Sequence, residues 1–159
     1  MIDPRARQLV DLCAEHGLTV GTAESLTGGL VAATIVDVPG ASAVFRGSVV
    51  SYATDLKVTL LGVDRHEIDR SGVVSAAVAT AMSAGARSAL SVDVALATTG
   101  VAGPGAHGGV AAGTVVVAAQ VGEIARTRTL ALPGDRSAVR SSTVGEVLGL
   151  CVEILRERR

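Results

Sequence analysis

The chain has 159 residues and a formal net charge of −1 at pH 7; 48% of its residues are hydrophobic and 18% are charged. This length predicts one domain, residues 1–159, that buries a sizeable core. So apolar a composition excludes intrinsic disorder, and the near-neutral charge without a basic stripe excludes nucleic acid as the main partner. Aromatic residues make up only 1%, so we expect a core of aliphatic side chains.

Apolar spacing, with glycine and proline between the apolar runs, predicts helices and strands that alternate through the first part of the chain. After that, two strands around the turn 121–123 are expected to form a hairpin. Alternation followed by an antiparallel pair predicts an α/β fold, a three-layer α/β/α domain around a mixed β-sheet. In chain order the expected elements are a helix over 4–16, a strand over 18–23, a helix ending at 36, a strand over 44–53, helices over 54–61, 64–70 and 75–90, a strand over 92–99, strands over 114–120 and 124–132, and a last helix after Asp135.

The segment 94–121 contains no Asp, Glu, Lys or Arg, which raises the question of a membrane span. Its glycines and Pro104 would break a helix and expose backbone to lipid, which excludes that assignment. The two cysteines lie far apart in apolar helical patterns, which favours core packing in a reducing compartment over a disulfide. Because the N-terminus also lacks an apolar signal sequence, we expect a cytoplasmic protein with no membrane partner.

Three glycine-bearing segments, residues 22–29, 100–105 and 134–136, each follow an expected strand. In open α/β sheets, ligands bind at the carboxyl ends of strands, where helix N-termini offer N–H groups to anions. None of the three is a dinucleotide fingerprint or a P-loop, so on spacing alone each is more simply a turn followed by a helix. On this simpler interpretation, Ser25 is the N-cap of a helix that begins near Leu26.

Both aromatic residues of the chain, Phe45 and Tyr52, lie in one segment that ends at its only lysine, Lys57. Every other cationic side chain is arginine, which cannot lose its proton, whereas a desolvated lysine can become neutral and act as a base. A sole lysine near a tyrosine and the candidate serine, Ser25, suggests a Ser/Lys nucleophile system. The alternative is that a single lysine is an accident of composition and lies on the surface.

Arg136 and Arg140 are four residues apart on the last expected helix, where they either clamp a phosphate or form a solvated face. The histidines, His16, His66 and His107, have no paired spacing and no neighbouring cysteine. We therefore expect no metal site.

Several short motifs occur in order along the chain: Thr22-Ala-Glu-Ser-Leu-Thr-Gly-Gly29, Asp37-Val-Pro-Gly-Ala-Ser42, Tyr52 with Lys57 and Leu61-Gly-Val63, Gly100-Val-Ala-Gly-Pro-Gly105, Gly113-Thr114 and Gly134-Asp-Arg136. Together they are specific, although no single one is. They resemble the CinA C-terminal domain family, the nicotinamide-nucleotide amidases of the PncC type, over about residues 5–155. Many relatives have a further N-terminal domain, so the chain resembles the stand-alone form.

The resemblance implies hydrolysis of the carboxamide of nicotinamide mononucleotide (NMN), which gives nicotinate mononucleotide and ammonia in pyridine-nucleotide salvage. It also implies a mechanism without a metal or another cofactor. Carried over by position, Ser25 is the expected nucleophile, Lys57 the base that activates it, and Tyr52 the residue that orients groups or relays protons. This fits amide hydrolysis, because a lysine that takes the serine proton can return it to the leaving ammonia.

We expect substrate-binding groups on two glycine-bearing loops and on two side chains. The N–H groups of the loops would contact the oxyanion or the phosphate, and either function is open for each loop. One side chain, an arginine, would contact the phosphate or the ribose, and an aromatic ring would either wall the nicotinamide pocket or only cover the sheet. These residues are Thr27, Gly28, Gly29, Gly100, Gly103 and Gly105 in the loops, together with Arg136 and Phe45.

The sequence departs from the family pattern at three places. Leu26 replaces the usual cysteine, residues 53–56 differ before Lys57, and the loop 106–112 is short and lacks the usual Lys-Pro. These changes keep two alternatives open: a non-catalytic nucleotide-binding module, and an amidase for another small amide. So hydrophobic a chain is also compatible with a homo-oligomer.

Overall fold

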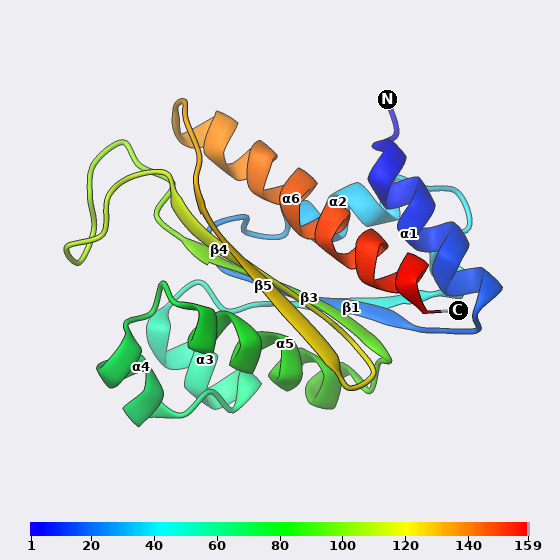
Figure 1. Cartoon of the computed structure of the whole chain (residues 1–159), viewed down its shortest axis with the longest axis horizontal. Coiled ribbons are helices and arrows are strands. Elements are labelled where there is room, and N and C mark those ends of the chain that lie inside the picture. Colours follow the sequence, from blue (N-terminus) through cyan, green and yellow to red (C-terminus); the bar gives the residue numbers. More distant parts are fainter. Residues whose placement is uncertain (159) are drawn as a thin grey trace.

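The computed structural model describes residues 1–158, which contain five strands and six α-helices (Figure 1). The strands are β1 (Val20–Glu24), β2 (Phe45–Val50), β3 (Val94–Gly100), β4 (Thr114–Val121) and β5 (Ile124–Ala131). The helices are α1 (Pro4–Glu15), α2 (Leu30–Val36), α3 (Thr54–Leu61), α4 (Arg65–Ser71), α5 (Ala76–Leu90) and α6 (Arg136–Glu157), with a short 3₁₀ turn at Ala41–Ala43.

The strands form one sheet in the order β2-β1-β3-β4-β5. β1 is parallel to both of its neighbours, whereas β3, β4 and β5 are successively antiparallel, so the sheet is mixed. Helices α1, α2 and α6 cover one face of the sheet, and α3, α4 and α5 lie on the other (Figure 1). The predicted three-layer α/β/α architecture is therefore confirmed.

The two helices that follow glycine-bearing segments begin differently. The last helix begins directly after Asp135, as predicted, and Asp135 is its N-cap, because its side chain accepts a hydrogen bond from the Ala138 N–H. The helix predicted to begin near Leu26 begins instead at Leu30, so the N-cap assignment of Ser25 is wrong. Gly28 and Gly29 adopt left-handed φ angles of 60° and 97°, which only glycine adopts readily. Residues 25–29 therefore form a turn before the helix starts.

Two strand ends determine where the site residues lie. β1 extends one residue further than predicted, to Glu24, so Ser25 directly follows the strand. β2 ends at Val50, earlier than predicted, so Tyr52 lies in the connection to α3. The other expected helices and strands are present with bounds that differ by a few residues.

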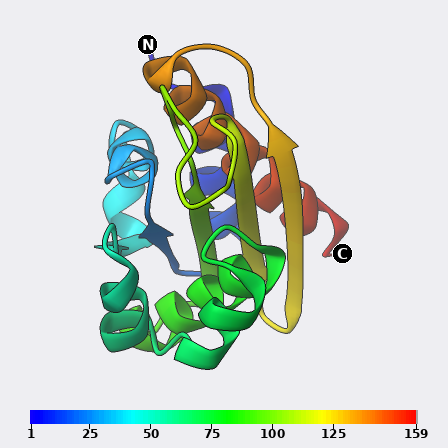
Figure 2. The ribbon, with the colours of Figure 1, turned by 90° about the vertical axis from the view of Figure 1, so that its left-hand side faces the viewer.

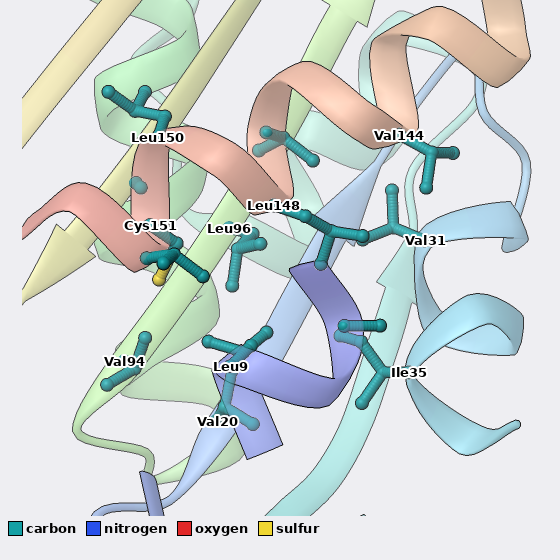
Figure 3. Close-up of a cluster of buried hydrophobic side chains, with 14 of the residues drawn as sticks. Leu9, Val20, Val31, Ile35, Val94, Leu96, Val144, Leu148, Leu150 and Cys151 are labelled. Carbon is teal, nitrogen blue, oxygen red and sulfur yellow. The ribbon is translucent and has the colours of Figure 1, made fainter. Parts of the chain in front are cut away.

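An aliphatic core lies between the sheet and helices α1, α2 and α6 (Figure 3). Leu9, Ile35 and Leu148 contribute to it from the three helices and are fully buried. Cys13 and Cys151 are free thiols in the same core, and burial raises the pKa of both. The predicted aliphatic core is confirmed, and none of the helices within residues 1–158 has both the length and the apolar character that a membrane crossing requires.

On the other face of the sheet, α5 packs on the strands and α3 packs on α5. This contact positions α3, the helix that carries Lys57. Gly85 makes the contact close, because a Cβ at this position would overlap the carbonyl oxygen of Leu61 at the end of α3. A backbone oxygen cannot rotate away as a side chain does, so a larger residue here must push the two helices apart.

We expect Gly85→Ala to lower the free energy of unfolding by about 1–3 kcal/mol through overpacking, even though alanine favours a helix by about 1 kcal/mol over glycine. Gly149→Ala in α6 is the matched control, because the nearest atom to a new Cβ there is 4.0 Å away. This control is expected to be neutral or stabilising. Urea unfolding measures both variants, and equal stability would contradict the close approach of α3 to α5.

Candidate active site

A pocket of about 560 Å³ lies where β1 and β3 end and β2 leads into α3. Figure 2 faces this end of the molecule, with the loop between β3 and β4 in front. All three glycine-bearing segments meet there, as predicted from the carboxyl ends of the strands. The lining comprises Ser25, Leu26, Tyr52, Thr54, Lys57, Arg136, residues 71–74, residues 99–108 and Val110.

Lys57 and Ser25 are in direct contact at this pocket. Lys57 is 1% exposed, and its Nζ donates to Ser25 Oγ at 3.0 Å. The same Nζ donates to the carbonyl oxygens of Ser51 at 2.7 Å and Tyr52 at 3.5 Å. The Ser25 backbone is held in turn, because its N–H donates to the Thr98 carbonyl of β3 at 3.1 Å. The chain's only lysine is therefore not a surface residue.

The surroundings of Lys57 favour its neutral form. Burial lowers the pKa of Lys57 from 10.5 to about 8, because removal from water disfavours the ammonium. Within residues 1–158, no carboxylate forms an ion pair that would stabilise its positive charge. The lowered pKa makes the neutral amine easier to form than it is for a lysine in water, whereas an arginine at this position would stay charged.

Tyr52 and Arg136 meet at the mouth of the pocket. Tyr52 is 59% exposed, and its hydroxyl accepts a hydrogen bond from Arg136 Nη2 at 3.0 Å. Arg136 Nη1 donates to the Gly103 carbonyl at 2.7 Å. Arg136 therefore connects the segment after β2 with the loop after β3. The contact of Tyr52 with Lys57 is made by its backbone carbonyl, and its hydroxyl faces Arg136.

The loop residues predicted to bind substrate divide into two groups. Gly100, Gly103 and Gly105 line the pocket. Thr27, Gly28 and Gly29 do not, since Thr27 is fully buried and the other two lie outside the lining. The structure thus brings the loop after β3 to the pocket, together with Ser25 and Leu26 of the turn after β1.

Phe45 does not reach the pocket. It is the first residue of β2 and pairs with Val20, so it lies at the opposite end of the sheet from Ser25. Phe45 packs against the core and lines a separate apolar depression with Val36 and Val38. Of the two functions considered for this ring, covering the sheet is the one that its position allows.

Two residues around the Ser25 turn have contacts that sequence reasoning did not predict. The carboxylate of Glu24 is fully buried beneath the turn and accepts hydrogen bonds from its backbone. Arg140 donates from Nε to the Leu26 carbonyl at 2.9 Å and from Nη2 to the Thr27 carbonyl at 2.8 Å. Arg140 is therefore a half-buried residue that holds two carbonyl groups of the turn. The available sequence signal for Glu24 was a lone charge at the end of an apolar strand.

His107 also lies in the pocket lining, on the loop after β3, although its sequence spacing gave no functional signal. Metal ligation is a separate question. Within residues 1–158, no group of three or more His, Cys, Asp and Glu side chains is arranged to hold a metal ion.

The chain is therefore an α/β domain in which a buried lysine donates to a serine at the end of a parallel strand. Residues 2–155 match the CinA C-terminal domain family, and the chain belongs to this family. It is 44% identical over 147 residues to the CinA-like protein of Frankia casuarinae, covering 92% of this chain and 34% of that protein. It is 46% identical over 140 residues to a putative competence-damage inducible protein of Levilactobacillus brevis, covering 87% of this chain and 34% of the relative.

Solved structures agree with this assignment. The competence damage-inducible protein A of Klebsiella pneumoniae superposes with a TM-score of 0.93 at 28% identity, over 98% of this chain and 97% of that one. The competence/damage inducible protein CihA of Agrobacterium tumefaciens gives a TM-score of 0.91 at 32% identity, over 98% and 95%. The chain thus spans nearly the full length of these structures, but only about 34% of the curated relatives above.

Proposed function

We propose that the protein is an amidohydrolase that converts NMN to nicotinate mononucleotide and ammonia. The observation that carries this proposal is the 3.0 Å hydrogen bond from buried Lys57 Nζ to Ser25 Oγ at the edge of the pocket. A nucleophile and a base within hydrogen-bonding distance are what covalent catalysis of acyl transfer requires. The choice of a nucleotide amide rests on the motifs shared with the nicotinamide-nucleotide amidases.

The reaction uses one proton that moves twice. Neutral Lys57 takes the Ser25 proton as Oγ bonds to the carboxamide carbon, and the carbonyl electron pair moves onto its oxygen. When this tetrahedral species collapses, the C–N bond breaks and Lys57 returns the proton to the nitrogen, which leaves as ammonia. Water then attacks the resulting ester with Lys57 again as base, which releases the acid and restores Ser25.

The oxyanion needs donors that are not already engaged. The Leu26 N–H has no backbone acceptor within residues 1–158, and Leu26 lines the pocket directly beside Ser25. An N–H beside the nucleophile is well placed to stabilise a developing oxyanion. This replaces the broader expectation that Thr27, Gly28 and Gly29 all donate to the substrate.

The remaining lining suits a small anionic ligand. The pocket volume of about 560 Å³ falls within the range of small-molecule sites. Arg136 places a cation at the mouth of the pocket, where a phosphate or a ribose hydroxyl would bind.

With this substrate, we assign the protein to pyridine-nucleotide salvage in the cytoplasm, without a cofactor. Exposed Val36 and Val50 are compatible with a homo-oligomer, for which light scattering is the test.

Ammonia release from NMN is the experiment that tests this function. We expect the purified protein to release one ammonia for each NMN consumed, with Ser25→Ala inactive under the same conditions. Tight binding of NMN without ammonia release would favour the non-catalytic nucleotide-binding module. Turnover of another carboxamide in a substrate panel, with NMN untouched, would favour an amidase for a different small amide.

We expect kcat/KM to rise with pH and to level off above about pH 8. The pKa of Lys57 is lowered to about 8, and only the deprotonated amine can take the Ser25 proton, so acidification removes the active form. Well below this pKa the rate should fall about tenfold for each pH unit. Circular dichroism at each pH is the control for folding, and a flat profile between about pH 6.5 and 9 would exclude Lys57 as the titrating base.

A further inference from the structure

Glu24 forms the most extensive polar network next to the pocket, although it does not line the pocket itself. Its carboxylate is fully buried at the end of β1. Oε2 accepts from the backbone N–H groups of Gly29 at 2.9 Å and Val31 at 3.1 Å, and Oε1 accepts from that of Ala32 at 2.8 Å. Three hydroxyl groups complete the network. They belong to Thr22 at 3.2 Å, Thr27 at 2.7 Å and Ser48 at 3.4 Å.

This network occupies the N-terminus of α2. The first N–H groups of a helix have no partner within the helix and attract an anion. Here the Glu24 side chain accepts from three N–H groups at this helix start, so these groups are not available to a substrate phosphate. The carboxylate oxygens of Glu24 therefore hold the turn between Ser25 and α2 through these hydrogen bonds.

The same turn is held from its carbonyl side as well. Arg140 of α6 donates to the carbonyls of Leu26 and Thr27. Within the turn, the Gly28 N–H donates to the Ser25 carbonyl at 3.0 Å. These contacts leave the turn little freedom to move, and its first residue is Ser25, whose Oγ must stay within reach of Lys57.

We infer that Glu24 is a positioning residue for the nucleophile, which holds the turn 25–29 so that Ser25 Oγ meets Lys57 Nζ. This inference rests on the proposed function, because it takes Ser25 as the reacting group. Displacement of a reacting atom by about 1 Å reduces rates about 100-fold. Loss of the Glu24 network is therefore expected to lower turnover more than substrate binding, since Glu24 lies outside the pocket lining.

Glu24→Gln is the sharpest variant because it keeps the shape of the side chain. A glutamine offers one acceptor oxygen and one NH₂ group, which is a donor only. Whichever way it is oriented, at least one backbone N–H among Gly29, Val31 and Ala32 faces that NH₂ group and loses its acceptor. We expect kcat for NMN to fall about 10- to 100-fold, with KM changed by less than about threefold.

Labelling with a fluorophosphonate provides a second measurement that does not depend on the substrate. Ser25 Oγ attacks phosphorus as Lys57 takes its proton, and fluoride leaves, so intact mass reports the rate at which the serine reacts. We expect the Glu24→Gln protein to label 10- to 100-fold more slowly than wild type. Ser25→Ala shows that the label is on Ser25, and Glu123→Gln, an exposed glutamate in the β4–β5 turn, is the matched control with wild-type rates.

A milder pair of variants covers the case in which Glu24→Gln does not fold. Thr27→Val removes one donor to Glu24 Oε2 and keeps the shape of the side chain, and Thr27→Ser restores the hydroxyl. We expect Thr27→Val to slow both reactions several-fold and Thr27→Ser to recover most of the rate.

The outcomes separate this inference from the proposed function. If wild type releases no ammonia from NMN but is labelled at Ser25, the NMN assignment fails, and Glu24 is judged by the labelling rates. Wild-type kcat and labelling rates in Glu24→Gln and Thr27→Val, with only a lower Tm, would show a purely structural network and overturn the inference. A wild-type protein that neither labels nor turns over would overturn it as well, because Ser25 would then not be an activated nucleophile.

Discussion

Replacement of Lys57 with methionine is expected to abolish ammonia release without lowering stability at pH 7. Methionine is unbranched and fills the same narrow space beside Ser25, but it cannot accept a proton. Without a base, Ser25 keeps its proton and attacks poorly, which we expect to reduce turnover at least 100-fold. Ammonia release and thermal unfolding of the same preparation measure the two effects.

The expectation that Lys57→Met keeps its stability at pH 7 follows from the lowered pKa of Lys57. Between about pH 8 and 10.5, the unfolded chain holds a proton on Lys57 that the folded chain has lost, so wild-type stability rises with pH across this window. Below pH 8 the folded state bears a penalty on the order of 3 kcal/mol for keeping a buried ammonium. The variant escapes this penalty but loses the donor to the Ser51 carbonyl, at about 1–3 kcal/mol. The relieved desolvation penalty and the lost hydrogen bond nearly cancel, so the free energy of unfolding at pH 7 is expected to change little.

Lys57→Arg is the matched control for the charge. Arginine keeps the positive charge but cannot act as a base, so this variant is expected to be inactive as well. It should also be less stable than the methionine variant, because a buried guanidinium cannot relieve its desolvation by losing a proton. Full activity of Lys57→Arg would remove Lys57 from the mechanism, and loss of the wild-type pH slope in both variants would assign that slope to Lys57.

The layer order of the fold was predictable because it depends on patterns that repeat along the chain. Apolar spacing placed α5 and α6, and the switch from alternating elements to a hairpin predicted the mixed sheet. The start of α2 was not predictable in the same way. A serine followed by helix-forming residues resembles an N-cap, but the left-handed Gly28 and Gly29 delay the helix to Leu30.

The contact between Ser25 and Lys57 could be predicted only when two sources of information were used together. The rule for the carboxyl ends of strands indicated where loops converge, and the family motifs indicated which side chains meet there. Phe45 shows the limit of proximity in sequence: it is seven residues from Tyr52, but the strand between them carries it to the other end of the sheet. Glu24 shows another limit, because no local pattern states that a strand-end carboxylate turns back onto the following helix.

Ser25→Ala is expected to lose turnover almost completely while it still binds NMN. Removal of the nucleophile in a serine hydrolase typically lowers kcat by about 10⁴-fold or more. The groups proposed to bind the nucleotide, Arg136 and the loop after β3, make no hydrogen bond to Ser25 Oγ within residues 1–158. We therefore expect the Kd for NMN, measured by calorimetry, to stay within about threefold of the Kd that wild type shows for a non-hydrolysable NMN analogue.

This separation of binding from turnover distinguishes the enzyme from a binding module. In an amidohydrolase, wild type consumes NMN and Ser25→Ala forms a stable complex with it, so the substrate is recovered intact from the variant alone. In a module without catalysis, both proteins return NMN unchanged. Ser42→Ala, an exposed serine before β2, is the matched control and should keep wild-type turnover. Ammonia release by Ser25→Ala at the wild-type rate would exclude Ser25 as the nucleophile, whatever the value of Kd.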